Sequence, residues 1–408
     1  MKWEKMMKSI LFVINTMGIG GGEKALLELL RQMDLQKYEV SLFVLTGQGE
    51  LINQLPDEIN LLNKKNYPVS VHDRAGKIRL FKTILRLMFS RGTCVRRMRY
   101  LLNHLKNMIK QGNIQKDKLL WKIIADGAER FERQYDLAVA YLEGGSAYYV
   151  ASHVNAKKKA AFIHINYVLA GYNRELDENC YLNFDHIFAV SESVKTAFLS
   201  VYPECSMCTS VFYNLLDEER IRREAKVNGG FSDDYGGYRI LTVGRLVPQK
   251  ALDLAVRTMK ILKNTKETFR WYVLGEGELR KKLQEQIKQF GLENDFILLG
   301  TVENPFPYYA QCDLYVHTAR FEGKSIAVEE AQILGCAILV TEYDGVQEQV
   351  TNNVDGMICT PEPEMMAERI LDFVNDPQKK RSYGLEAARK KQRDNLKEVN
   401  QLTALLRD

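Results

Sequence analysis

The chain alternates between short, continuous apolar runs and longer segments in which apolar residues recur at helical spacing. Residues 9–15 (SILFVIN) form one apolar run, 23–32 have the pattern of an amphipathic helix, and 38–46 (YEVSLFVLT) form a second run. Similar runs follow at 137–142, 160–165 and 186–191. Continuous rather than alternating apolar runs are typical of strands that are buried on both faces. The pattern predicts a parallel sheet covered by helices on both sides.

The same rhythm starts again after residues 226–239 (KVNGGFSDDYGGYR), which contain four glycines and two aspartates and are typical of a linker. Beyond them we expect strands at 239–244 and 269–275 and in the runs FILLG, LYVHT and AILVT. The intervening helices are expected over 251–263, 278–291 and 325–334.

The sequence of 408 residues therefore predicts an α/β protein of two doubly wound, Rossmann-like domains that face a central cleft. We expect an N-terminal domain over 1–215 and a C-terminal domain over 216–386. Residues 387–408 are expected to form a helix that packs back on the N-terminal domain.

Composition points to the cytoplasm. No apolar run approaches the roughly 18 residues that a membrane-spanning helix needs, and the first apolar run is too short for a signal peptide. Seven scattered cysteines, an odd number, favour a reducing compartment over a disulfide framework.

Charge is concentrated in residues 77–122, which contain thirteen Lys and Arg and a single acid, Asp117. On a helix over 77–88, the cations Arg79, Lys82 and Arg86 share one face. Phe81, Ile84, Leu85 and Met88 share another. Such a block favours peripheral contact with an anionic membrane. The alternative is a helix that packs on the domain core with its charges in water. Nucleic acid is not expected as a partner, because the block lacks interleaved aromatic residues.

Residues 320–332 (RFEGKSIAVEEAQ) carry two acids eight positions apart, Glu322 and Glu330. If LYVHT is a strand, this loop lies at its carboxyl end, with Ser325 as the N-cap of the next helix. Free backbone N–H groups over 323–327 would then form an anion site suited to a diphosphate. Glu330 could bind a ribose diol, and Glu322 would lie nearer the reacting group. The alternative is two solvated acids that the helix dipole favours.

Two further loops are expected on the same rim. GRLVPQK (244–250) follows a strand directly, so Arg245 and Lys250 could balance a diphosphate both when it is bound and as it departs. LGEGELR (274–280) contains Gly275 and Gly277, which allow a close approach of the backbone.

These motifs, in this order, resemble those of the retaining glycosyltransferase family 4, which has the GT-B fold. The resemblance rests on GRL–QK, LGEGELR, RFEGKS–EE with its E-x7-E spacing, GIGGGEKALLEL (18–29) and GVQEQVTNNVDGMIC (345–359). Two positions depart from the family pattern: Ala251 stands where glycine is usual, and Lys324 where an apolar residue is common.

The resemblance implies a role for each matching residue. Glu322 and His164 (in FIHINY) would touch the donor sugar, and together with Arg245 and Lys250 they form the implied catalytic set. Glu143 and Gly144 end another N-terminal strand, so we expect them on the acceptor side, although a plain strand-to-helix turn would explain them as well. The implied donor-binding residues are Gly20, Gly21, Gly22, Gly244, Arg245, Lys250, Gly275, Gly323, Lys324, Ser325, Ile326 and Glu330.

The implied activity is transfer of a hexose, with retention of configuration, from a nucleotide-diphosphate sugar to a lipid-linked or polysaccharide acceptor. A UDP-sugar is the expected donor, and bacterial surface polysaccharides such as capsule are the expected products. No D-x-D motif is present, so no metal or other cofactor is expected. A cytoplasmic location, peripheral at the inner face of the cell membrane, follows.

Two other classes of protein share parts of this pattern. A dehydrogenase is disfavoured because the first glycine loop lacks the third glycine of a dinucleotide site and no acid ends the second strand. A non-catalytic partner subunit that binds a sugar nucleotide remains the alternative.

Overall fold

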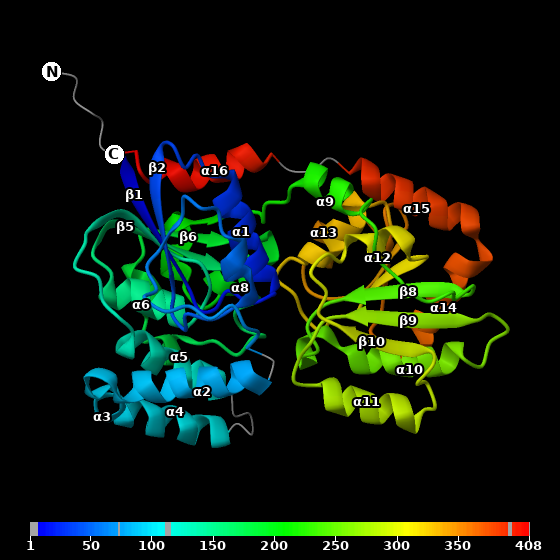
Figure 1. Cartoon of the computed structure of the whole chain (residues 1–408), viewed down its shortest axis with the longest axis horizontal. Helices are drawn as coiled ribbons and strands as arrows, with labels where there is room; N and C mark the ends of the chain where they lie inside the picture. Colours follow the sequence, from blue (N-terminus) through cyan, green and yellow to red (C-terminus); the bar gives the residue numbers. More distant parts are fainter. Residues whose placement is uncertain (1–6, 72–73, 111–115, 391–393, 408) are drawn as a thin grey trace. The chain divides into compact units, whose positions relative to one another are not determined.

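The computed structural model describes residues 7–71, 74–110, 116–390 and 394–407. The chain divides into two compact units (Figure 1). Unit 1 comprises Met1–Leu216 together with Asp394–Asp408, and unit 2 comprises Asp217–Arg393.

Unit 1 is built on a seven-stranded sheet in the order β3-β2-β1-β4-β5-β6-β7, in which all paired strands are parallel. In this order β2 and β3 extend the sheet on one side of β1, and β4 to β7 extend it on the other. The carboxyl ends of β1 and β4 mark the point where the strand order reverses, which is where ligands bind in such sheets. The strands are β1 (Lys8–Ile14), β2 (Tyr38–Val44), β3 (Asn60–Leu61), β4 (Tyr135–Ala140), β5 (Ala156–Ile163), β6 (His186–Ala189) and β7 (Thr209–Val211).

Helices cover both faces of this sheet. Leu11 and Val13 of β1 point to the face covered by α5 (Lys116–Gly127), α6 (Gly145–His153) and α8 (Glu192–Leu199), where they join a continuous apolar core. Helix α1 (Gly21–Gln32) lies on the opposite face, beside α16 (Asn395–Ala404) (Figure 1). A short helix, α7 (Arg174–Asp177), lies between β5 and β6.

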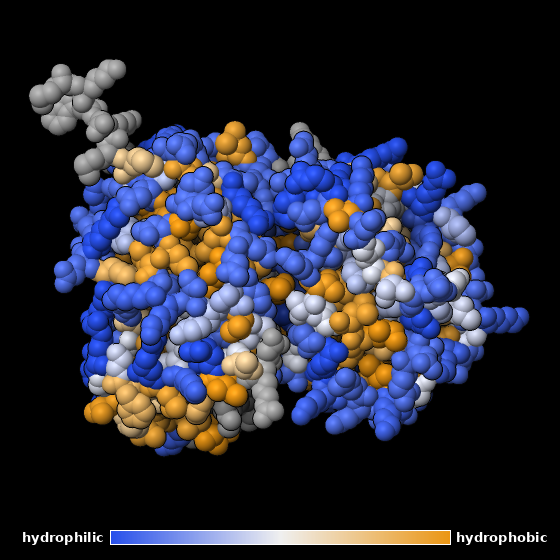
Figure 2. All heavy atoms as spheres, in the orientation of Figure 1, coloured by the Kyte–Doolittle hydropathy of each residue, from blue (hydrophilic) through white to orange (hydrophobic). Residues whose placement is uncertain are grey.

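The basic segment folds as α2 (Arg74–Phe89), α3 (Thr93–Arg96) and α4 (Met98–Lys110). Thr83 and Leu87 form the buried side of α2, whereas Phe81 and Leu85 are exposed. Part of the predicted apolar face is therefore exposed rather than packed on the core, and the cations Arg79, Lys82 and Arg86 are exposed as well. Figure 2 shows hydrophobic residues gathered on the surface in the region of α3 and α4. The side chains of Lys110 and Lys116, both in the predicted basic block, lie outside the described residues.

Unit 2 repeats the architecture with six parallel strands in the order β10-β9-β8-β11-β12-β13. The strands are β8 (Tyr238–Val243), β9 (Phe269–Leu274), β10 (Phe296–Gly300), β11 (Leu314–His317), β12 (Ile338–Thr341) and β13 (Met357–Cys359). The helices α10 (Leu252–Leu262), α11 (Arg280–Gln289) and α14 (Pro363–Asn375) pack on one face around Trp271 and Val273. On the other face lie α12 (Phe306–Gln311) and α13 (Ile326–Ile333) (Figure 1).

The glycine-rich segment 226–239 is not the linker that its composition suggests. It follows α9 (Glu218–Glu224) and belongs wholly to unit 2. Asp233 accepts hydrogen bonds from Arg270 at 2.7 Å and from the Tyr272 hydroxyl at 2.6 Å, and Phe231 packs against Tyr272. These contacts hold the segment against β9.

The helix expected from residue 387 begins instead at Asn395, because α15 (Pro377–Arg389) extends past residue 387 and stays with unit 2. Helix α16 is joined to unit 1 by polar contacts. The Asn395 side chain donates to the Leu216 carbonyl at 2.7 Å, and Glu398 accepts from the Tyr213 amide at 3.3 Å. Val399 and Leu402 are buried.

Among the described helices, none combines the length and the low charge that crossing a bilayer requires.

Candidate functional site

In unit 2 the candidate residues lie where β8, β9 and β11 end at the same edge of the sheet. The pairing of Val243 with Leu274 shows that β8 and β9 end together. Gly275 and Gly277 then bring the loop after β9 against the loop after β8. A Cβ on Gly275 would lie 2.0 Å from the Gly244 carbonyl oxygen, and one on Gly277 would lie 2.3 Å from that of Leu246. Only glycine allows this contact.

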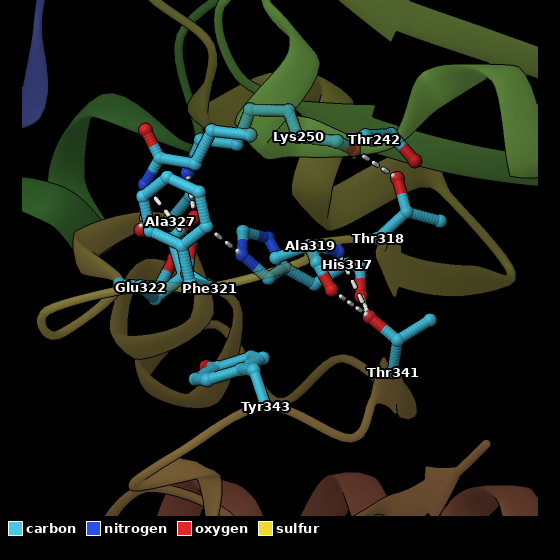
Figure 3. A network of polar contacts seen from close by, with 12 residues as sticks. Thr242, Lys250, His317, Thr318, Ala319, Phe321, Glu322, Ala327, Thr341 and Tyr343 are labelled. Carbon is cyan, nitrogen blue, oxygen red and sulfur yellow. Dashed lines mark hydrogen bonds and ion pairs between the residues drawn. The ribbon is translucent and has the colours of Figure 1, made fainter. Parts of the chain in front are cut away.

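Glu322 is the centre of a buried polar network on this edge (Figure 3). One carboxylate oxygen forms an ion pair with the Lys250 ammonium and lies 3.3 Å from His317 Nε2. The other accepts a hydrogen bond from the Gln249 side chain at 3.3 Å. Burial opposes ionisation of Glu322, but Lys250 and His317 outweigh it and lower its pKa to about 2. Glu322 is therefore a fixed carboxylate at neutral pH.

His317, which the sequence analysis did not identify, orients that carboxylate. It ends β11 and is 1% exposed. Burial, together with the Lys250 charge, lowers its pKa and keeps the ring neutral. The Tyr315 hydroxyl lies 3.1 Å from Nδ1. If that hydroxyl donates to Nδ1, the ring proton is on Nε2, facing Glu322. The sequence feature that could have identified His317 is a histidine at the end of a strand, five residues before Glu322.

Arg320 is a second residue that the sequence analysis missed. Its guanidinium donates to the Pro248 carbonyl at 2.6 Å and to both oxygens of Asp253 at 2.9 Å. It thereby holds the Lys250 loop against the loop that carries Glu322.

Ala251, which stands where the family usually has glycine, has an unusual backbone conformation in the Lys250 loop. Ala251 has φ +48°, in the left-handed region that glycine adopts without strain. The backbone conformation usual for glycine is therefore kept here at some conformational cost.

Helix α13 begins at Ile326 with Ser325 as its N-cap residue, as the sequence predicts. The expectation of free amides over 323–327 is wrong at Ser325, whose N–H donates to the Gln349 side chain at 2.8 Å. Gln349 in turn donates to the Ser325 carbonyl at 2.9 Å. The Ser325 hydroxyl is buried and has no hydrogen-bond partner among the described residues. A buried hydroxyl without a partner at a helix N-terminus is suited to an incoming anion.

Three other donor-side candidates differ in their surroundings. Lys324 is neither solvated nor free, because its buried ammonium forms an ion pair with Glu329. Glu330 is also buried and accepts a hydrogen bond from the Tyr309 hydroxyl at 3.0 Å. Arg245, by contrast, is exposed on the loop after β8.

In unit 1 the structure brings together Gly22, at the start of α1, and His164, which follows β5. A Cβ on Gly22 would lie 2.6 Å from the Leu142 side chain and 3.9 Å from the His164 ring. Burial lowers the pKa of His164 to about 3, although a hydrogen bond to the Tyr141 backbone acts the other way. His164 Nε2 is covered and has no partner among the described residues. A neutral imidazole thus presents an unused nitrogen beside the glycine loop.

Glu143 lies directly against this histidine. Its carboxylate accepts hydrogen bonds from the backbone N–H groups of His164 and, at 3.0 Å, Ile165. Burial raises the pKa of Glu143 to about 7, with those hydrogen bonds opposing the rise. Gly144 follows it at φ +76° and precedes α6. The predicted unit 1 residues therefore share one edge, as do those of unit 2.

Comparison with known proteins shows similarity in sequence over part of the chain and in fold over nearly all of it. Residues 232–391 match the family model described as "Glycosyl transferases group 1". The solved structure of Anabaena Alr3699/HepE in complex with UDP-glucose superposes with a TM-score of 0.66 at 17% identity, covering 98% of this chain and 99% of that one. Sucrose-phosphate synthase from Thermosynechococcus elongatus superposes with a TM-score of 0.64 at 14% identity, covering 98% and 96%. The predicted GT-B fold is confirmed, and residues 232–391 are similar to the group 1 glycosyl transferases.

Named relatives are similar over part of their length. The N-acetylgalactosamine-N,N'-diacetylbacillosaminyl-diphospho-undecaprenol 4-alpha-N-acetylgalactosaminyltransferase of Campylobacter jejuni is 30% identical over 42% of this chain and 46% of its own length. The amylovoran biosynthesis glycosyltransferase AmsK of Erwinia amylovora is 29% identical over 32% and 33%. The matches thus span less than half of each of these two relatives.

Proposed function

We propose that the protein transfers a hexose from a nucleotide-diphosphate sugar, a UDP-sugar, to a lipid-linked or polysaccharide acceptor, with retention of configuration. The observation that carries this proposal is the buried Glu322, held as a carboxylate by Lys250 and His317 immediately before the N-terminus of α13. That arrangement combines fixed charges with helix-end amides, which suits a sugar diphosphate.

On the donor side, Arg245 and Lys250 would bind the diphosphate oxygens, with Gly244 and Gly275 allowing its approach. Gly323, Lys324, Ser325 and Ile326 would line the sugar and phosphate, and the unpartnered Ser325 hydroxyl would donate to a phosphate oxygen. Glu330 would accept from the ribose hydroxyls, sharing the carboxylate that now accepts from Tyr309. The HepE complexes with UDP and UDP-glucose support a uridine nucleotide.

Unit 1 would supply the remaining groups. Gly20, Gly21 and Gly22 would bring backbone close to the donor, and the unused Nε2 of His164 would accept a hydrogen bond from a hydroxyl of the donor sugar. Glu143 and Gly144, which adjoin His164, would contact the acceptor.

The reaction would break the bond between the anomeric carbon and the diphosphate oxygen. It would form a bond from that carbon to the acceptor hydroxyl on the same face. The departing phosphate oxygen would take the proton of the acceptor hydroxyl. Arg245 and Lys250 would balance the charge of the leaving group, so no metal ion would be required. The Glu322 carboxylate would lie beside the anomeric centre, where positive charge develops.

The names of two relatives suggest the kind of acceptor and the cellular location. The name of the Campylobacter jejuni relative describes an undecaprenol-linked acceptor, and that of AmsK describes polysaccharide biosynthesis. We propose a bacterial surface glycan of the capsule type as product, made by a cytoplasmic protein peripheral to the inner face of the cell membrane.

The test is a panel of nucleotide sugars, measured by thermal shift and by release of nucleoside diphosphate, with and without a chelator. We expect a UDP-sugar to raise the melting temperature and release of UDP to persist in the chelator. Arg245→Gln and Glu330→Gln should each weaken donor binding about ten- to a hundredfold, the usual range for a charge-assisted hydrogen bond. Lys281→Gln, at an exposed position of α11, is the matched control.

Unchanged donor affinity in both variants would contradict the assigned roles, and loss of turnover in the chelator would contradict the metal-free chemistry. A non-catalytic partner subunit would give a thermal shift without any release of UDP in the presence of acceptor lipids.

A further inference from the structure

The outward side of α2, α3 and α4 carries large apolar residues that no described part of the chain covers. We call them the apolar face, which comprises nine residues: Ile78, Phe81, Leu85, Phe89, Val95, Met98, Leu102, Leu105 and Ile109. Phe89 is 74% exposed, Val95 79% and Phe81 60%. Figure 2 shows hydrophobic residues gathered in the region of α3 and α4.

The apolar face follows the helical repeat. On α2 its members stand at 78, 81, 85 and 89, and on α4 at 98, 102, 105 and 109. Steps of three and four residues place each set on one side of its helix. The opposite side of α2 is used in the core, where Leu87 is buried and a Cβ on Gly127 of α5 would lie 2.2 Å from the Leu87 carbonyl oxygen. Helix α2 is therefore apolar on two sides, only one of which the fold requires.

Cations surround the apolar face and acids are absent from it. The sequence from Arg74 to Lys110 contains no Asp or Glu. Its exposed cations are Lys77, Arg79, Lys82, Arg86, Arg91, Arg96, Arg99 and Lys106. Apolar side chains ringed by exposed lysine and arginine match the two parts of an anionic lipid surface, its acyl chains and its headgroups.

The helices are fixed to the part of unit 1 that carries the acceptor-side candidates. Arg97 forms ion pairs with Asp126 at 2.5 Å and with Glu178 at 3.0 Å. The Tyr100 hydroxyl donates to the Leu176 carbonyl at 2.9 Å. On the same side, Tyr172 lies under the Lys118 ammonium, and its hydroxyl would be 3.2 Å from a Cβ on Gly144.

We propose that the apolar face docks the protein on an anionic bilayer, with its large side chains inserted between headgroups and the surrounding cations binding lipid phosphates. The docking itself follows from the surface and does not depend on the transferase activity. It deepens the proposed function by naming the surface that would hold a lipid-linked acceptor beside Glu143 and Gly144. A second copy of this chain is a poorer occupant, because pairing the two faces would bring eight exposed cations against eight others.

The experiment is flotation of the full-length protein with vesicles of phosphatidylglycerol and phosphatidylcholine, and with vesicles of phosphatidylcholine alone. We expect binding to the anionic vesicles that weakens as salt is raised from about 0.1 M to 1 M, where the screening length falls from about 10 to 3 Å. Binding to neutral vesicles should be at least about tenfold weaker.

Two sets of variants separate the apolar and charged contributions. Replacing Phe81, Phe89, Leu102 and Ile109 with Ser should weaken binding at least about tenfold, because four large side chains no longer insert. The matched control replaces Leu182, Met207, Leu385 and Leu396, exposed apolar residues elsewhere, with Ser and should bind normally. Replacing Lys82, Arg86 and Arg99 with Gln should weaken binding about ten- to a hundredfold. The control with the same change in charge replaces Lys281, Lys282 and Lys288 with Gln.

Each variant is checked for an unchanged melting temperature and unchanged UDP-sugar binding, so that failure to dock is distinguished from failure of the proposed function. Equal binding to neutral and anionic vesicles, or normal binding by the apolar variant, would overturn the proposal. So would a wild-type dimer in solution that the apolar variant abolishes while vesicle binding persists.

Discussion

Glu322 shows how a single carboxylate acquires its properties from neighbours far away in the sequence. Lys250 lies seventy-two positions before it, yet its ammonium forms the ion pair that, with His317, offsets the cost of burying the acid. The acid itself and its spacing from Glu330 are visible in the sequence. The identity of its partners depends on the pairing of β11 with β8, which places the two loops side by side.

The ion pair between Lys250 and Glu322 predicts a specific effect of removing the Lys250 ammonium. Lys250→Met should destabilise unit 2 by about 3–5 kcal/mol, because it leaves a buried charge without compensation. The double variant Lys250→Met with Glu322→Gln should recover most of that loss. Denaturant unfolding at pH 7 measures the wild-type protein, both single variants and the double variant, and additive effects in the double variant would contradict the coupling.

The same ion pair gives the pH dependence a definite sign. Because the folded pKa of Glu322 is about 2, below its ordinary value of 4.5, the stabilisation is complete above about pH 4.5. It should be lost as the pH falls from there through about 2, and Glu322→Gln should lose less stability over that interval than the wild-type protein. Equal acid sensitivity of the two proteins would show that the carboxylate is not held as described.

At the level of helices and strands, the continuous apolar runs correctly predict the principal strands of both sheets, because a strand buried on both faces has few polar positions. The short strands β3, β7 and β13 were missed, since two or three residues carry too little pattern. The glycine-rich segment 226–239 was misinterpreted as a linker. Its Asp233 is indistinguishable by composition from a solvated acid, and only the folded chain shows that Arg270 and Tyr272 bind it.

The loop after β9 offers a test of how closely two elements approach. Gly275→Ala should cost more than about 2 kcal/mol, because the new Cβ would meet the Gly244 carbonyl and Gly275 has φ +142°. Gly291→Ala is the control, since Gly291 has φ +64° with open space around it and should cost about 1 kcal/mol. Thermal or denaturant unfolding compares the two, and equal losses would contradict the close approach of the two loops.

For the molecule as a whole, the division into two units predicts that a core substitution in one unit destabilises that unit and not the other. Leu402 of α16 is buried in unit 1, although it lies beyond unit 2 in the sequence. Leu402→Ala should destabilise unit 1 by about 2–5 kcal/mol, the usual range for a buried leucine. Hydrogen exchange should show faster exchange in β1 and α1 and an unchanged rate in β8 and β9. Equal loss of protection in both units would show that they unfold as one.

The amino-acid pattern alone was sufficient for two doubly wound units, for the glycines and acids of the motifs and for the unusual cation content of one segment. Each of these is local, since a strand, a turn or a helix end needs only its own few residues to be recognised. The partners of Glu322, the unpartnered hydroxyl of Ser325 and the exposed side of α2 and α4 required the folded chain. They depend on which loops and faces meet, and residues dozens of positions apart determine that through strand register and packing.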